Sequence, residues 1–133
     1  GILFEDFPWW SAVMLKNPRV TVVPLPLYYY IPNFGGIVLS AKQLKIMKSL
    51  CTGIKSAYKL YKDHADNEQM KKWQSQFMWY FVNWAFRKLK YLKTDAEIDE
   101  ARNEFIDMNK IGVFDDVPNE WYDLREKIYE FIK

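Results

Sequence analysis

The one histidine of this sequence lies in a short polar stretch that also carries three carboxylates. His64 is the only histidine, and Asp63, Asp66 and Glu68 lie within four positions of it. Zinc and iron sites generally need several His or Cys ligands, and these carboxylates lack the spacing and the glycine of a calcium loop. We therefore expect no metal ion and no cofactor. No Gly-rich phosphate loop occurs, and no nucleophile turn accompanies His64, so we predict that the chain is not an enzyme.

The remaining reactive or acidic groups favour structural roles. Cys51 is the only cysteine, which excludes an internal disulfide, and it falls at the edge of the apolar face of a predicted helix. We expect it to be a packing residue. A later acidic segment is typical of a solvated or inter-subunit helix face rather than of a catalytic pair; its residues are Glu97, Asp99, Glu100 and Glu104.

The strongest functional signal is a row of lysines on one predicted helix. At 100° per residue the row covers about 100° of arc opposite the apolar face; its members are Lys45, Lys48, Lys55, Lys59 and Lys62. Lysines at one-turn intervals can contact successive phosphates without reading bases. We therefore predict sequence-independent binding to the DNA backbone, with Lys16 and Arg19 as secondary contacts. The alternative is a solvated helix face.

The net charge of +2 conceals a strong polarity along the chain. Residues 41–94 carry twelve Lys or Arg against three acidic residues, a net charge of +9, whereas residues 95–133 carry five basic against twelve acidic residues, a net charge of −7. A dipolar molecule of this kind can bind a polyanion on one side and stack on copies of itself. Neutralisation of the two halves inside one bundle is the alternative.

Helical signals dominate residues 37–133, which we expect to form one bundle domain. Capping patterns and apolar spacing predict four helices, over 40–63, 66–92 and 94–112 and from Pro118 onward, with a capping box at Thr94 and Glu97 and an N-cap at Asp66. The expected fold is therefore an all-α four-helix bundle preceded by an extended N-terminal arm.

The most apolar run lies in the second of these helices. Nine of the ten residues 77–86 are apolar or aromatic. A membrane span needs about 20 such residues, so this run is too short to be one. We expect a central core helix; the alternative is that a second copy of the chain, or lipid, covers part of its aromatic surface.

Residues 1–36 form the predicted arm. Five prolines interrupt it, leaving 9–16 as the best gap for a short helix, and 20–32 should be extended. An apolar arm must lie either on its own bundle or on a neighbouring subunit, and we favour the neighbour. The predicted subunit-interface residues are Val22, Val23, Leu25, Leu27, Tyr28, Tyr29, Tyr30, Ile31 and Phe34.

Three short motifs in this arm are shared with a known family. They are Phe-Pro-Trp-Trp at 7–10, Asn-Pro-Arg-Val at 17–20 and Ile-Pro-Asn-Phe at 31–34, just before the first bundle helix. The layout resembles the coat proteins of filamentous and rod-shaped archaeal DNA viruses, in which an aromatic-rich arm precedes a compact helical bundle. The resemblance implies a coat subunit that polymerises around double-stranded DNA in a virion, with a lipid envelope as a further contact.

These observations predict a self-assembling structural protein. Its expected partners are other copies of itself or a paralogous subunit, double-stranded DNA bound without sequence specificity, and a lipid envelope, with no small-molecule substrate. The alternative is a non-enzymatic adaptor or accessory subunit whose arm docks on a different protein. No secretory signal is evident in residues 1–6, so outside a virion we expect an intracellular location.

Overall fold

The computed structural model describes residues 3–4, 6–16, 18–21, 23–25, 36, 41–64 and 66–133. Within these ranges the chain forms five α-helices and no strand: α1 (Asp6–Met14), α3 (Gln43–His64), α4 (Glu68–Arg87), α5 (Asp95–Lys110) and α6 (Tyr122–Ile132). Two short 3-10 helices, Leu89–Tyr91 and Asn119–Trp121, follow α4 and precede α6. The all-α prediction is confirmed for this part of the chain.

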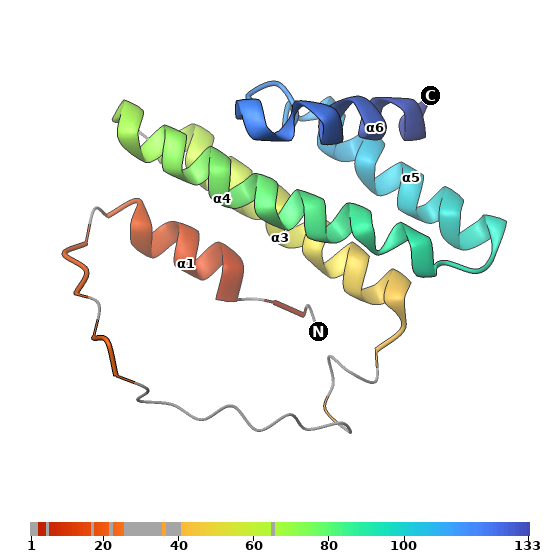
Figure 1. Cartoon of the computed structure of the whole chain (residues 1–133), viewed down its shortest axis with the longest axis horizontal. Helices are drawn as coiled ribbons and strands as arrows, with labels where there is room; N and C mark the ends of the chain where they lie inside the picture. Colours follow the sequence, from red (N-terminus) through yellow and green to blue (C-terminus); the bar gives the residue numbers. More distant parts are fainter. Residues whose placement is uncertain are drawn as a thin grey trace.

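The helices are arranged in layers around an antiparallel pair. Figure 1 shows α3 and α4 side by side, with α1 on one flank and α5 and α6 on the other. Helix α3 is the central element because it contacts α1, α4 and α5. No helix in the described ranges combines the length and the apolar character needed to cross a membrane.

Local signals explain where the helices begin and end. The Thr94 side chain accepts a hydrogen bond from the Glu97 backbone N–H at 3.2 Å, which confirms the predicted cap of α5. The predicted N-cap of α4 is wrong by one residue: Asn67, not Asp66, accepts from the Met70 N–H at 2.7 Å. Gly112 follows α5 with a φ of +89°, a backbone conformation that favours glycine and ends the helix.

The core lies between α3, α4, α5 and α6. Its largest fully buried side chains include Leu50, Trp79, Phe105, Phe114 and Ile128. These residues come from every helix of the predicted bundle and from the loop after α5, so one continuous core joins them.

The N-terminal segment adds a helix to this core: α1 corresponds to the short helix expected at 9–16 but begins at Asp6. Its packing on its own bundle corrects, for residues 6–14, the expectation that the arm lies on a neighbour. Phe7 of α1 is 2% exposed and stacks on Phe81 of α4 with ring centroids 3.9 Å apart. The Leu3 backbone N–H donates to Ser49 Oγ at 3.3 Å. Pro8 falls in the first turn of α1, where the missing N–H has no helical partner, so proline is tolerated.

A notch in α3 receives α1. A Cβ built on Gly53 would lie 3.1 Å from Phe7 Cδ1, so the Phe7 ring would have to shift by a few tenths of an ångström to admit any side chain there. The buried Gln74 side chain donates to the Ser11 carbonyl at 3.2 Å. Because these contacts are complementary, α1 belongs to the same core as the bundle.

The aromatic run 77–86 is a core segment, as predicted. Met78, Trp79, Val82 and Ala85 are buried, while Phe77, Phe81, Trp84 and Phe86 are partly buried against the core. The cover over Phe77, Phe81 and Trp84 includes this chain's own Phe4 and Phe7. Tyr80 is the member of the run that stays exposed.

Candidate functional site

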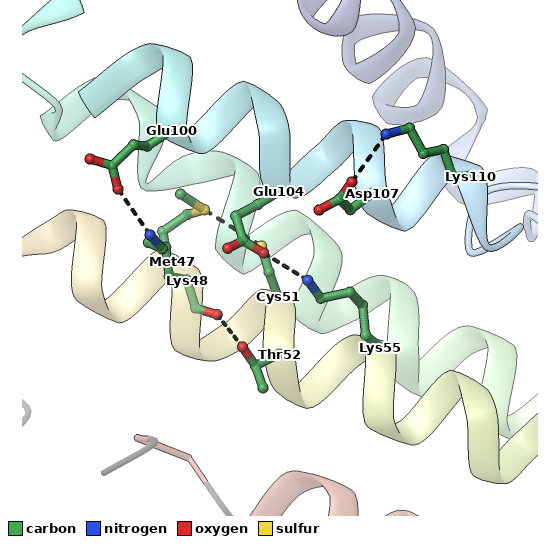
Figure 2. A network of polar contacts seen from close by, with 9 residues as sticks. All are labelled: Met47, Lys48, Cys51, Thr52, Lys55, Glu100, Glu104, Asp107 and Lys110. Atoms are coloured by element: carbon green, nitrogen blue, oxygen red, sulfur yellow. Dashed lines mark hydrogen bonds and ion pairs between the residues drawn. The ribbon is translucent and has the colours of Figure 1, made fainter. Parts of the chain in front are cut away.

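The lysine row of α3 divides into two groups in the structure. Lys45, Lys59 and Lys62 are exposed. Lys48 and Lys55 instead face α5, where Lys48 Nζ lies 2.9 Å from Glu100 Oε2 and Lys55 Nζ lies 2.9 Å from Glu104 Oε2 (Figure 2). The basic and acidic halves of the chain therefore neutralise each other in part within the bundle.

The two ion pairs differ in how firmly they hold their lysines. The Lys48 and Glu100 side chains are about half exposed, and such pairs contribute about 0–1 kcal/mol. The hydrogen bond to Glu100 raises the pKa of Lys48. The Lys55 and Glu104 side chains are only 29% and 18% exposed, so this pair is shielded from water and serves mainly to join α3 to α5.

The secondary DNA contacts predicted from the sequence lie outside the bundle helices. Lys16 is exposed just after α1, and Arg19 is exposed in the stretch that follows. Among the described residues, none of the ion pairs uses Lys16, Arg19, Lys45, Lys59 or Lys62. These five cations therefore remain available to a polyanion.

Two of the predicted subunit-interface residues are described. Val23 and Leu25 are 50% and 65% exposed, and neither lies in a helix. The other seven, Val22, Leu27, Tyr28, Tyr29, Tyr30, Ile31 and Phe34, lie outside the described residues.

Further exposed apolar side chains accompany Val23 and Leu25. Trp9 and Trp10, on the solvent side of α1, are 59% and 47% exposed, and Val20 is also exposed. We call Trp9, Trp10, Val20, Val23 and Leu25 the N-terminal apolar residues. About half or more of each of these side chains is exposed, in contrast to Phe7, which is buried in the same helix as the two tryptophans.

Two of the surface grooves along α4 are lined by aromatic rings. One, of about 400 Å³, is lined by Trp73, Gln76, Phe77 and Tyr80. The other, of about 360 Å³, lies at the C-terminal end of the helix and is lined by Tyr80, Asn83, Trp84, Arg87, Lys88, Lys90 and Tyr91. We call the second the basic groove.

The sequence reasoning did not identify the basic groove. The signal was present, because Arg87, Lys88 and Lys90 directly follow the aromatic run and Tyr91 comes next. Whether these basic residues form a binding groove depends on which aromatic rings beside them face solvent. Only the fold shows that Tyr80 and Tyr91 are exposed.

His64 and Cys51 lie in settings unlike those of catalytic groups. His64 is exposed at the end of α3, and the described residues contain no group of three or more His, Cys, Asp or Glu able to hold a metal ion. Cys51 is fully buried beside Met47, and burial raises the pKa of its thiol, which disfavours the reactive thiolate. The predicted packing role of Cys51 is confirmed.

Comparison of the chain with protein-family models, with curated proteins and with solved structures gives no match.

Proposed function

We propose that this chain is a structural subunit that assembles with copies of itself and binds the DNA backbone without reading its sequence. A coat subunit of a filamentous or rod-shaped virus particle, the role that the sequence resemblance implies, fits this description. The observation that carries the proposal is the exposure of the N-terminal apolar residues. Tryptophan, valine and leucine side chains gathered in one segment and left in water are typical of a surface that another protein covers.

The groove lined by Trp73, Gln76, Phe77 and Tyr80 supports this proposal as the receiving surface on a second copy. It presents two half-buried rings, Trp73 and Phe77, stacked at 5.1 Å, beside the exposed Tyr80. A tryptophan or leucine side chain from the N-terminal segment of a neighbouring copy would pack against these rings.

The geometry of such a contact is compatible with a polymer. The donor surface consists of the N-terminal apolar residues on α1 and in the stretch after it, whereas the acceptor surface is the groove on α4. When the donor surface of each copy contacts the acceptor surface of the next, the contact is heterologous, and repeating it produces a ring or an open filament; reciprocal exchange within one pair would give a closed dimer.

Electron microscopy of the purified protein, with and without linear duplex DNA at low salt, tests this function. The proposal expects filaments or extended ribbons whose number or length increases with DNA. Dispersed particles under both conditions would contradict the proposed self-assembly and would favour the alternative function, a protein-binding adaptor.

DNA binding itself depends on the exposed lysines of α3. Changing Lys59→Gln and Lys62→Gln together should reduce the slope of log affinity against log salt by about two, because each phosphate contact contributes about 0.9 to that slope. Filter binding or fluorescence anisotropy with a duplex measures this slope at several salt concentrations.

The matched control for this experiment is on α6 and at the C-terminal residue. Lys127→Gln with Lys133→Gln removes the same two charges from exposed positions of the acidic segment. If the α3 variant and the control give equal slopes, α3 is not the DNA contact.

A further inference from the structure

The basic groove at the end of α4 concentrates positive charge that nothing in the groove neutralises. Arg87, Lys88 and Lys90 line it, and its lining contains no carboxylate. Within the described ranges, none of the ion pairs uses any of these three residues. The groove therefore has a net positive potential that an anion would reduce.

Aromatic rings hold two of the ammonium groups over the groove. Lys88 Nζ lies 5.9 Å from the centroid of Trp84 and 5.8 Å from that of Tyr91, and Lys90 Nζ lies 4.7 Å from the centroid of Tyr91. A ring attracts a cation through its quadrupole and leaves its charge intact. The lysines are thus positioned in advance without being neutralised.

The polarity of α4 accounts for only part of this arrangement. The carbonyl end of a helix is stabilised by nearby cations, so one or two of the basic residues are expected there. That effect gives no reason for exposed rings, yet Tyr80 and Tyr91, which line the groove with the cations, are 59% and 51% exposed. Rings and cations lining one groove suit a ligand that carries both negative charge and flat aromatic groups.

We propose that the basic groove binds single-stranded nucleic acid, a site additional to the duplex-binding lysines of α3. Arg87, Lys88 and Lys90 contact the phosphodiester groups, and an unpaired base stacks on Tyr80 or Tyr91. Base-on-ring stacking together with a basic track is how proteins hold single strands without reading their sequence. A duplex offers its phosphates but keeps its base faces stacked, so it would leave the rings unused.

Fluorescence anisotropy with a labelled dT oligonucleotide, and with a hairpin duplex of equal phosphate number, tests this proposal. Loss of the groove should weaken binding to the single strand more than binding to the hairpin, which the α3 lysines also contact. Arg87→Glu with Lys90→Glu should weaken oligonucleotide binding at least about tenfold. The charge-matched control, Lys127→Glu with Lys133→Glu, should bind the oligonucleotide within about twofold of wild type. Far-UV circular dichroism checks that each variant is folded.

The ring variant separates base stacking from charge. Tyr80→Leu with Tyr91→Leu keeps every cation and should still weaken oligonucleotide binding about five- to tenfold, with an unchanged salt slope. Binding equal to wild type would overturn the proposal, since the groove would then bind polyanions in general. Loss of binding to phosphatidylserine vesicles in the charge variant, with oligonucleotide binding unchanged, would overturn it in favour of a lipid surface.

Duplex binding that depends on Lys59 and Lys62 can fail while single-strand binding at the groove persists, and the reverse also holds. The two sets of charge variants therefore distinguish failure of this inference from failure of the proposed function. Because Tyr80 also lines the groove proposed for assembly, the ring variant is compared with wild type where sedimentation shows both in the same oligomeric state.

Discussion

The ion pair between Lys55 and Glu104 joins the central helix to α5 at the boundary between the basic and the acidic parts of the chain. Its side chains are mostly shielded from water, whereas Lys59, one turn further along α3, is exposed. Two lysines of the same predicted row therefore have different roles. The register between α3 and α5, which the sequence does not contain, decides which lysine is which.

Charge reversal at these two lysines should separate the roles. Lys55→Glu places a carboxylate against Glu104 and should lower the free energy of unfolding by about 1–3 kcal/mol, because a partly buried charge loses its partner. Lys59→Glu should change it by less than about 0.5 kcal/mol. Urea denaturation measures both, and Lys55→Glu combined with Glu104→Lys should recover most of the loss. Equal effects of the two single changes would contradict the assignment of Lys55 to the α3–α5 contact.

Tyr61 makes the stability of the bundle sensitive to alkaline pH. Burial and then the hydrogen bond to Asp116, 3.0 Å long, raise the pKa of its hydroxyl above the ordinary value of 10.0. A raised pKa means that the folded state keeps its proton longer than the unfolded state, so stability is full below pH 10 and is lost as the pH rises above it. Burial of Cys51 acts in the same direction from its ordinary pKa of 9.0.

Denaturation curves collected from pH 8 to pH 11 test this linkage. Tyr61→Phe should lose less stability than wild type above pH 10, while the two proteins keep a constant difference below it. Parallel pH profiles across the whole range would show that the Tyr61 hydroxyl has no part in the alkaline loss.

At the scale of helices, α3, α4, α5 and α6 follow from the sequence, as does a short helix close to the position of α1, but the docking of α1 on the core does not. Periodic apolar residues and caps such as Thr94 are local signals, so they can be found without the fold. The docking of α1 rests on Phe7 fitting against Gly53, two residues far apart in the chain. Composition rich in proline predicted an arm, and only this non-local contact shows that its first part is a core helix.

The fit between α1 and α3 can be tested with two substitutions. Phe7→Ala should destabilise the protein by about 3 kcal/mol through the lost ring contacts with Phe77 and Phe81. Gly53→Val should also destabilise it, by about 1–3 kcal/mol, because its side chain would occupy the place of the Phe7 ring. The two changes act on one contact, so their combined effect in urea denaturation should be clearly smaller than the sum. Additive effects would show that Gly53 and Phe7 are not coupled.

The basic groove shows the same limit of sequence reasoning at the scale of a surface. Apolar periodicity places residues on a face of α4, but it does not say which faces α1, α5 and α6 cover. Tyr80 was grouped with the buried aromatic run, and the structure exposes it because α1 covers the neighbouring Phe77 and Phe81 instead.

At the scale of the whole molecule, the chain combines a well-packed bundle with an apolar segment that the bundle does not cover. The buried core is continuous from Leu3 to Ile128. Further along the N-terminal part, Trp9, Trp10, Val20, Val23 and Leu25 remain in water. A bundle that is complete without these side chains leaves them free to bind a neighbour, and this is the central claim of the proposed assembly.

Sedimentation velocity of the purified protein over a wide concentration range, with no DNA present, measures that claim most directly. Wild type should form larger species as its concentration rises, whereas Trp9→Ser with Trp10→Ser, which alters exposed positions only, should stay folded and sediment as a monomer. A wild-type protein that remains a monomer at every concentration, or a double variant that assembles as wild type does, would contradict it.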